Sequence, residues 1–258
     1  MIEPIDIRSR DNPLLQRLRK VSRDPAGYRK RGELWLEGEH LCRALLAHGL
    51  RPAQSVIAES AWAQPPWRGL ASQAARVLRV PDALFEAFSA LESPARIGFV
   101  IELPTAPPID PQAASVVLDR LQDAGNVGSI LRSAAAFGVG QVIALQGTAA
   151  LWSPKVLRAG MGAHFGLRLI ESLQPADLDA LTLPWVGTSL GAERTLDQVR
   201  LPRPCAWLVG HEGQGVDAAL LARCAQVIRI PQPGGEESLN VAAAAAVCLY
   251  ESMRQRDQ

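Results

Sequence analysis

The chain has 258 residues, 48% of them apolar and 21% charged, with a formal net charge of +1. This composition supports a sizeable core and excludes a disordered chain, and the length favours two domains. The longest apolar run, residues 241–250, is about half of what a bilayer span needs, so no membrane association is expected. The N-terminal residues carry acids and no apolar stretch typical of a signal peptide, so we expect a cytoplasmic protein.

Cysteine and histidine give no indication of a metal centre. The four cysteines and four histidines show no spacing typical of metal ligands. Each cysteine lies in an apolar context, where a free thiol behaves as a small hydrophobic side chain. We therefore expect inert core thiols and predict no metal site.

Positive charge is concentrated between Arg8 and Arg31, where nine basic residues stand against Asp11 and Asp24. Such a run often forms only a solvated helix face. Clustered arginine and lysine side chains also bind nucleic acid, because they neutralise phosphates and release counterions. The candidate nucleic-acid contacts are Arg8, Arg10, Arg17, Arg19, Lys20, Arg29, Lys30 and Arg31.

Helices and strands alternate through the first hundred residues. The spacing of Leu14, Leu15 and Leu18 behind Asn12 and Pro13 predicts a helix over residues 12–20. This alternation predicts a small α/β domain over residues 1–103. The other predicted elements are helices at 39–48 and 82–90 and strands at 33–37, 54–58, 77–80 and 97–103.

Four prolines among residues 103–112 predict a semi-rigid linker at 104–112, followed by a second domain over 113–258. Strands and helices alternate again in this second half. The pattern predicts a mostly parallel sheet that is covered on both faces. The predicted strands are 115–118, 141–145, 185–188, 206–209 and 227–230, and the predicted helices are 129–137, 153–161, 177–181, 215–225 and 239–255.

Three glycine-bearing turns, at 125–128, 210–215 and 234–235, each follow a predicted strand. Ligands of parallel sheets bind at the carboxyl ends of strands, so these turns are expected to meet in one crevice. A polar residue near a helix start often serves only as a cap, but its recurrence at all three turns favours a ligand site. The polar residues are Asn126, Glu212, and Ser238 with Asn240.

One turn also fits a dinucleotide-binding fingerprint. Gly213, Gly215 and Ala218 follow a strand with the spacing of its G-x-G-x-x-A variant. That interpretation requires an acid at the end of the next strand to hold a ribose, and residues 227–231 supply none. No P-loop sequence occurs either, so a dinucleotide fold is the weaker alternative.

Three motifs in order resemble those of the SpoU/TrmH family of RNA ribose 2′-O-methyltransferases, within the SPOUT superfamily. Residues 118–133 are similar to the family's first motif, residues 208–216 to its second, and residues 230–241 to its third. The N-terminal stretch with Asn12-Pro13 and Leu36-Glu-Gly-Glu39 is similar to the family's L30e-like substrate-binding domain. Together the resemblance spans nearly the whole chain.

The resemblance implies an α/β protein whose mostly parallel C-terminal sheet carries a deep trefoil knot. Knotted chains are rare exceptions, and periodicity alone does not predict one. The implied methyl donor is S-adenosylmethionine, the substrate is RNA, and the assembly is a homodimer with active sites at the subunit interface. The N-terminal domain favours 23S-type ribosomal RNA. The alternatives are a tRNA 2′-O-methyltransferase and a catalytically inactive RNA-binding relative.

The resemblance also implies roles for individual residues. The donor is expected to contact Gly210, Ile230 and Leu239, with Leu190 forming a wall. Arg132 is the residue usually proposed as the base. A guanidinium remains protonated, so we expect it to orient a phosphate and stabilise the developing alkoxide. The implied catalytic set is Arg132, Asn126, Glu212, Ser238 and Asn240, in which Glu212 has the alternative role of ordering its own loop.

One position departs from the family's pattern. The family often has an acid three residues after the motif arginine, and this chain has Ala135 there. The difference puts a contact at an interface or beside the site in doubt. It removes none of the five implied catalytic residues.

Overall fold

The computed structural model describes residues 3–234 and 238–255. Two compact units result, an N-terminal unit of Met1–Thr105 with Trp152–Phe165 and a C-terminal unit of Ala106–Leu151 with Gly166–Gln258. The segment Trp152–Phe165 thus packs with the N-terminal unit, whereas the sequence placed it in the second domain. Within the described ranges, no helix is both long enough and apolar enough to cross a membrane.

The N-terminal unit contains a mixed five-stranded sheet. Its strands are β1 (Ile5–Asp6), β2 (Glu33–Glu37), β3 (Gln54–Ala58), β4 (Arg76–Val80) and β5 (Ile97–Glu102), in the order β1-β4-β3-β5-β2. Strands β1, β4 and β3 run parallel, and β5 runs antiparallel to both β3 and β2. The predicted strands of this half are confirmed to within one residue at each end, except that β1 was not predicted.

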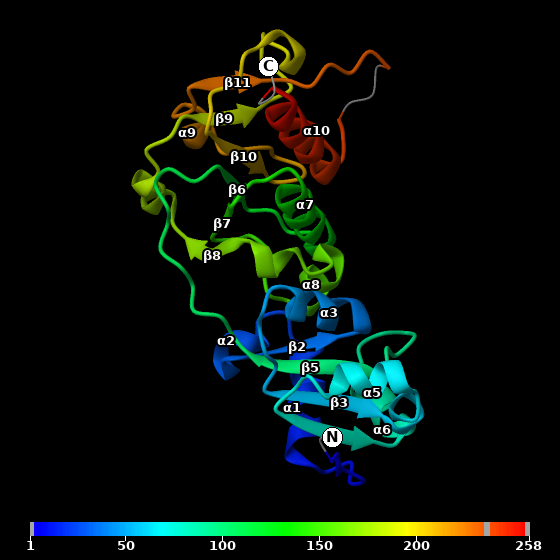
Figure 1. Cartoon of the computed structure of the whole chain (residues 1–258). Helices are drawn as coiled ribbons and strands as arrows, with labels where there is room; N and C mark the ends of the chain where they lie inside the picture. The colour runs from blue at the N-terminus through cyan, green and yellow to red at the C-terminus, as the bar shows by residue number, and fades with distance from the viewer. Residues whose placement is uncertain (1–2, 235–237, 256–258) are drawn as a thin grey trace. The chain divides into compact units, whose positions relative to one another are not determined.

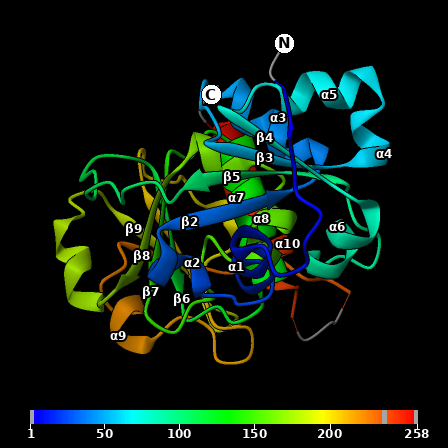
Figure 2. The same cartoon turned by 90° about the horizontal axis from the view of Figure 1, so that it is seen from below.

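Helices cover both faces of this sheet. Figure 2 shows α4 and α5 on one side and α1 and α6 on the other. The sequence did not predict α2, α4 or α5. The helices of the unit are α1 (Pro13–Val21), α2 (Gly27–Arg31), α3 (Glu39–Ala47), α4 (Glu59–Trp62), α5 (Pro65–Ala71), α6 (Asp82–Phe88) and α8 (Pro154–Gly160), with the 3₁₀ helix η1 (Ala163–Gly166).

An aromatic cluster packs α6 onto the sheet. The Trp35 ring of β2 lies 6.2 Å from the Phe85 ring and 5.6 Å from the Phe88 ring, centroid to centroid. Gly98 of β5 makes room for the indole, because a Cβ at this position would lie 2.2 Å from a Trp35 ring carbon. The contact requires glycine at residue 98, since protein cores are packed without spare volume.

Helix α1 is anchored at both ends. The Asn12 side chain accepts a hydrogen bond from the Leu14 N–H at 2.9 Å, which confirms the predicted helix start. At the other end, the buried Ser22 hydroxyl donates to the Phe88 carbonyl at 2.9 Å. This bond joins the end of α1 to the end of α6.

The C-terminal unit is built on six parallel strands in the order β11-β9-β10-β6-β7-β8. This confirms the predicted parallel sheet. In Figure 1, α7 and α10 lie side by side on one face and α9 lies on the other. The strands are β6 (Ser115–Asp119), β7 (Gln141–Leu145), β8 (Arg168–Leu173), β9 (Trp185–Thr188), β10 (Ala206–Gly210) and β11 (Gln226–Ile228). The helices are α7 (Ala124–Ala136), α9 (Ala218–Leu221) and α10 (Val241–Arg254), with 3₁₀ helices η2 (Pro175–Ala180) and η3 (Leu196–Gln198).

Several predicted elements of this unit were wrong in their bounds or type. Helix α7 begins at Ala124 rather than 129, because the Asp123 side chain accepts a hydrogen bond from the Asn126 N–H at 2.8 Å and caps the helix early. The predicted turn at 125–128 is therefore helical. The predicted helix at 177–181 is a 3₁₀ helix, and the one at 215–225 is only four residues long. Strand β8 was missed, and the predicted turn at 234–235 lies partly outside the described residues.

Replacing Gly98 with alanine is expected to destabilise the N-terminal unit by about 2 kcal/mol, because the added methyl group overlaps the Trp35 ring. The measurement is urea unfolding followed by tryptophan fluorescence. Gly69→Ala is the matched control, since a Cβ there meets nothing within 4 Å and the residue lies within α5. Equal stabilities for the two variants would contradict the packing described for Trp35.

Candidate active site

A pocket of about 500 Å³ opens at the carboxyl ends of β9, β10 and β11. The loops after these three strands line it, together with Ser238, Leu239 and the first turns of α10. This is the edge at which parallel sheets bind ligands. The pocket contains every residue that the sequence assigned to the donor: Gly210, Ile230, Leu239 and Leu190.

The loop after β10 is tightly folded against its own strand. A Cβ at Gly210 would lie 2.1 Å from the Gly215 carbonyl carbon, so no other residue fits without moving the loop. Gly215 has a φ of +71° and donates its N–H to the His211 carbonyl at 2.8 Å. The Gly213 N–H donates to His211 Nδ1 at 3.0 Å. These bonds fix the backbone of the loop where it lines the pocket.

Asp119, at the end of β6, anchors this loop through hydrogen bonds, a role that the sequence did not reveal. Its side chain is 4% exposed and accepts from Arg120 Nε at 2.8 Å and Nη2 at 3.0 Å. It also accepts from the Asp217 N–H at 2.8 Å, and Arg120 Nη1 donates to Gln214 at 3.2 Å. The one available signal was an acid at the carboxyl end of an apolar strand.

Three of the predicted catalytic residues meet in a hydrogen-bonded chain, which we call the polar chain: Glu212, Asn126 and Asn240. Asn240 Nδ2 donates to Asn126 Oδ1 at 3.0 Å, and Asn126 Nδ2 donates to Glu212 Oε1 at 3.4 Å. Glu212 also accepts from the backbone N–H groups of Gln122 at 3.3 Å and Asp123 at 3.1 Å. Residues from all three sequence motifs are therefore linked side by side.

The hydrogen bonds to Glu212 favour the ionised form of its side chain. Partial burial opposes the charge and raises the pKa of this carboxyl group. The N–H groups of Asp123, Glu212 itself and Gln122, followed by the Asn126 amide, outweigh that effect and lower the pKa below its ordinary value. Hydrogen bonds to a charged acceptor are about twice as strong as neutral ones. Glu212 thus acts as an anionic clasp between the loop after β10 and the start of α7.

Asn240 has two functions at once. Its Oδ1 accepts from the N–H groups of Ala242 at 2.9 Å and Ala243 at 3.3 Å, so it is the N-cap of α10. Its Nδ2 remains available for Asn126. Ser238 lines the pocket beside it. The capping interpretation of Asn240 is therefore correct, but it leaves out the third side-chain hydrogen bond, from Nδ2 to Asn126.

Arg132 stands apart from the other predicted catalytic residues. It is exposed on α7 and makes no side-chain hydrogen bond or ion pair within residues 3–234 and 238–255. Asn126 and Arg132 are six residues apart on one helix, so their side chains point in different directions. Arg132 does not line the pocket of its own chain, and Ala135, one turn further, is also exposed.

The predicted nucleic-acid contacts all lie in the N-terminal unit, and they differ in their surroundings. Arg8 pairs with Glu59 at 3.1 Å, and Arg17 pairs with Glu33 at 3.2 Å. The Arg29 guanidinium lies 5.5 Å from the centre of the Tyr28 ring. Lys30 and Arg31 end α2. The remaining three, Arg10, Arg19 and Lys20, line a common groove.

The structure is that of an α/β protein with a pocket at the edge of a parallel sheet. The SpoU rRNA methylase family matches residues 113–250, which is more than half of the chain. The chain belongs to this family.

Relatives extend the likeness to the whole chain. An uncharacterised tRNA/rRNA methyltransferase of Synechocystis is 33% identical over 97% of this chain and 94% of its own length. The 23S rRNA (guanosine(2553)-2′-O)-methyltransferase RlmP of Bacillus subtilis is 34% identical over 64% of this chain and 68% of its own. The crystal structure of an AdoMet-bound rRNA methyltransferase from Sinorhizobium meliloti aligns with a TM-score of 0.85 at 25% identity, over 97% of both chains.

Replacing Glu212 with glutamine is expected to lower the free energy of unfolding of the C-terminal unit by about 1 kcal/mol at pH 7, a value kept low because the residue is exposed and water screens its charge. A carboxylate with a lowered pKa contributes its full stability above the ordinary pKa. That contribution disappears as the pH falls through the lowered value. Urea unfolding between pH 3.5 and 7 measures the difference.

Glu193→Gln is the control for this experiment, because Glu193 is exposed and makes no side-chain hydrogen bond with a described residue. It should match the wild type at every pH. The account is contradicted if Glu212→Gln and the wild type have the same free energy of unfolding at pH 7. It is also contradicted if their difference in this free energy stays constant down to pH 3.5.

Proposed function

We propose that this protein transfers a methyl group from S-adenosylmethionine to the 2′-hydroxyl of a ribose in 23S-type ribosomal RNA. The observation that carries the proposal is the polar chain, which joins all three family motifs beside a pocket at the strand ends. The B. subtilis relative acts on 23S rRNA, and this favours rRNA over tRNA. A catalytically inactive RNA-binding protein would not need the polar chain of Glu212, Asn126 and Asn240.

The pocket fits the methyl donor. Leu190 and Leu239 are apolar side chains that are 63% and 41% exposed on its wall, where they suit the faces of an adenine ring. The Oε1 atom of Gln232 is buried in the pocket lining and accepts no hydrogen bond from any described residue. An exocyclic amino group supplies the missing donor. Cofactor sites typically combine apolar walls of this kind with polar groups that fix the orientation of the ligand.

S-adenosylmethionine, when bound, supplies an electrophilic methyl group on a cationic sulfonium. The residues of the chain position the reactants, and positioning alone accounts for a large part of the rate of such a displacement. Asn126, Glu212 and Asn240 fix the pocket loops relative to the starts of α7 and α10. Ser238 and Asn240 face the incoming ribose, and Arg132 orients the neighbouring phosphate and stabilises the alkoxide as the hydroxyl proton leaves.

A homodimer completes the proposed site. Val247 and Tyr250 of α10 are apolar side chains that are 42% and 49% exposed, and the Tyr250 ring packs edge-on against Phe137 after α7. Exposed apolar patches of this kind mark interaction surfaces. Arg132 lies on the adjoining helix and does not line the pocket of its own chain. We assign this α7–α10 face to the dimer interface, where Arg132 serves the partner subunit's pocket.

Family membership supports three further parts of the proposal. The C-terminal segment is knotted as a deep trefoil, and the pocket loops belong to that knot. The N-terminal unit is an L30e-like domain that binds the RNA substrate, while residues 113–258 carry the methyltransferase activity. The protein acts in the cytoplasm, where ribosomal RNA is modified.

Replacing Arg132 with alanine is expected to lower the turnover of methyl transfer to rRNA by a factor of about 100 or more while leaving donor affinity unchanged, because the guanidinium acts on the transition state. Tritium transfer gives the rate and calorimetry gives the affinity. Arg200→Ala removes another exposed arginine of the same unit and should keep full activity. Unchanged turnover in Arg132→Ala would remove this residue from the proposed mechanism.

Replacing Gln232 with leucine is expected to weaken donor binding about fivefold, the effect of losing one hydrogen bond to a neutral group. The change conserves shape and removes an unsatisfied polar atom, so the free protein should be no less stable. Gln146→Leu, at an exposed position of the same unit, is the control. Donor affinity equal to that of the wild type would separate Gln232 from the donor.

A further inference from the structure

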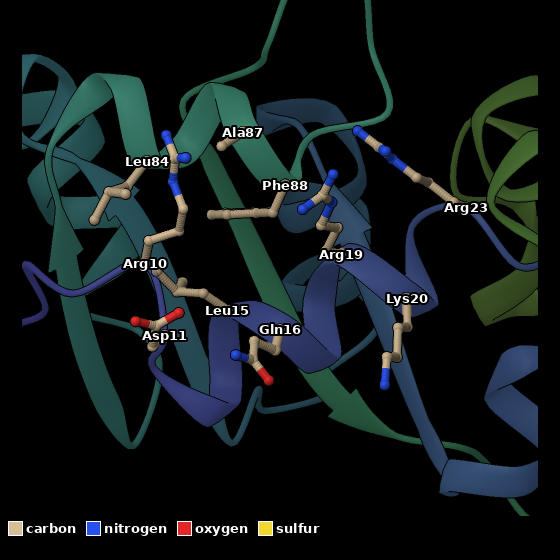
Figure 3. A pocket seen from close by; sticks show the side chains of 10 residues that line it. All are labelled: Arg10, Asp11, Leu15, Gln16, Arg19, Lys20, Arg23, Leu84, Ala87 and Phe88. Carbon is tan, nitrogen blue, oxygen red and sulfur yellow. The ribbon is translucent and has the colours of Figure 1, made fainter.

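Helices α1 and α6 of the N-terminal unit form the walls of a groove of about 770 Å³. Its surface is apolar inside, with Leu15, Leu84, Ala87 and Phe88, and basic around the opening. Figure 3 shows the guanidinium groups of Arg10, Arg19 and Arg23 reaching into the space between the two helices, whereas the Lys20 amino group points away from it.

The basic residues of this groove are free to bind an anion. Arg10, Arg19, Lys20 and Arg23 are all exposed, and none forms an ion pair with a carboxylate within the described ranges. One acid, Asp11, lines the groove with them. Other arginines of the same segment, such as Arg17, are already paired with glutamates. Four basic residues of the segment that have no ion pair with a described carboxylate therefore meet at the groove.

The walls of the groove are held in place before any ligand arrives. The Ser22 hydroxyl donates to the Phe88 carbonyl at 2.9 Å in a buried hydrogen bond that joins the two helices. Phe88 is itself fixed against the Trp35 ring. Leu84 and Ala87, one turn apart on α6, remain partly exposed within the groove. A rigid apolar surface beside unpaired guanidinium groups costs little to order on binding.

We propose that this groove binds an unpaired, single-stranded segment of the RNA substrate, outside the segment that is methylated. Phosphates bind Arg10, Arg19 and Arg23, because a guanidinium matches two phosphate oxygens at once. One splayed base lies on the aliphatic surface of Leu84 and Ala87 and stacks on a guanidinium plane. The proposal rests on the proposed function, since it takes the substrate to be RNA.

Other polyanions fit the groove less well. A duplex keeps its bases stacked inside and presents phosphates and sugars, which leaves the apolar surface of the groove without a partner. An acidic peptide supplies carboxylates without a planar apolar group. A single strand alone combines evenly spaced anions with exposed base faces.

The test compares two double variants that remove equal charge from one segment of the full-length protein. Arg10→Gln with Arg19→Gln removes groove arginines, and Arg8→Gln with Arg17→Gln removes paired ones. Binding of a fluorescein-labelled 12-residue oligouridylate is measured by anisotropy at several salt concentrations. The groove variant should bind at least tenfold more weakly, with a salt slope lower by about 1.4 for two lost phosphate contacts. The paired variant should change affinity less than twofold.

A second comparison tests the base contact. Leu84→Ser should weaken oligouridylate binding about threefold, but it should not weaken binding of an oligomer of equal length whose central riboses lack bases. Equal losses in the two double variants would overturn the proposal. So would displacement of the oligouridylate by a 12-residue oligoglutamate or an RNA duplex as effectively as by unlabelled oligouridylate.

Methylation assays keep this proposal separate from the proposed function. If oligouridylate binding depends on Arg10 and Arg19 but no methyl is transferred to 23S rRNA, the proposed function is refuted and the proposal for the groove stands. If the groove variant transfers methyl groups with an unchanged KM for rRNA, the proposal for the groove is refuted and the proposed function stands. A raised KM with an unchanged turnover number supports both.

Discussion

The hydrogen-bonded chain of Glu212, Asn126 and Asn240 connects three segments that are remote in sequence and adjacent in space. Each residue lies at the carboxyl end of a strand or at the start of a helix, where backbone N–H groups need partners. Glu212 satisfies two such groups at the start of α7, and Asn240 satisfies two at the start of α10. Asn126 joins the two. Local helix capping and assembly of the site are therefore performed by the same side chains.

Rigid backbone around the pocket depends on this arrangement. Gly210, Gly213 and Gly215 have no side chains, so the loop after β10 is held by the hydrogen bonds of its other residues. Asp119 fixes one part of the loop through Asp217 and, through Arg120, Gln214. Glu212 fixes another part. These hydrogen bonds fix the loop at which we propose that the methyl donor binds.

The sequence predicted five of the six strands of the C-terminal sheet, because these strands are short runs of mostly β-branched and apolar residues, whereas β8 was missed. Helix starts were harder to predict. Asp123 caps α7, which begins five residues before the predicted start, because a side-chain cap competes with the glycines that suggested a turn. The packing of Trp152–Phe165 with the N-terminal unit depends on tertiary contacts that no local pattern encodes.

The site residues also differ in how well the sequence predicted them. Motif spacing identified Asn126, Glu212 and Asn240 correctly as neighbours, whereas the buried Asp119 gave only a weak signal. The basic run was visible in the composition. Sequence alone did not separate Arg8 and Arg17, which pair with glutamates, from Arg10 and Arg19, which pair with no acid among the described residues. That distinction depends on which acids the fold brings nearby.

The most direct test of the account is a double-mutant cycle between Asn126 and Asn240, each replaced by alanine, with donor affinity measured by calorimetry. The cycle cancels the loss of the α10 cap, which is common to both variants that lack Asn240. If the polar chain holds the pocket together, the double variant should lose about 1 kcal/mol less binding free energy than the sum of the single variants. Losses that add within about 0.3 kcal/mol would show that the two residues act independently and would contradict the account.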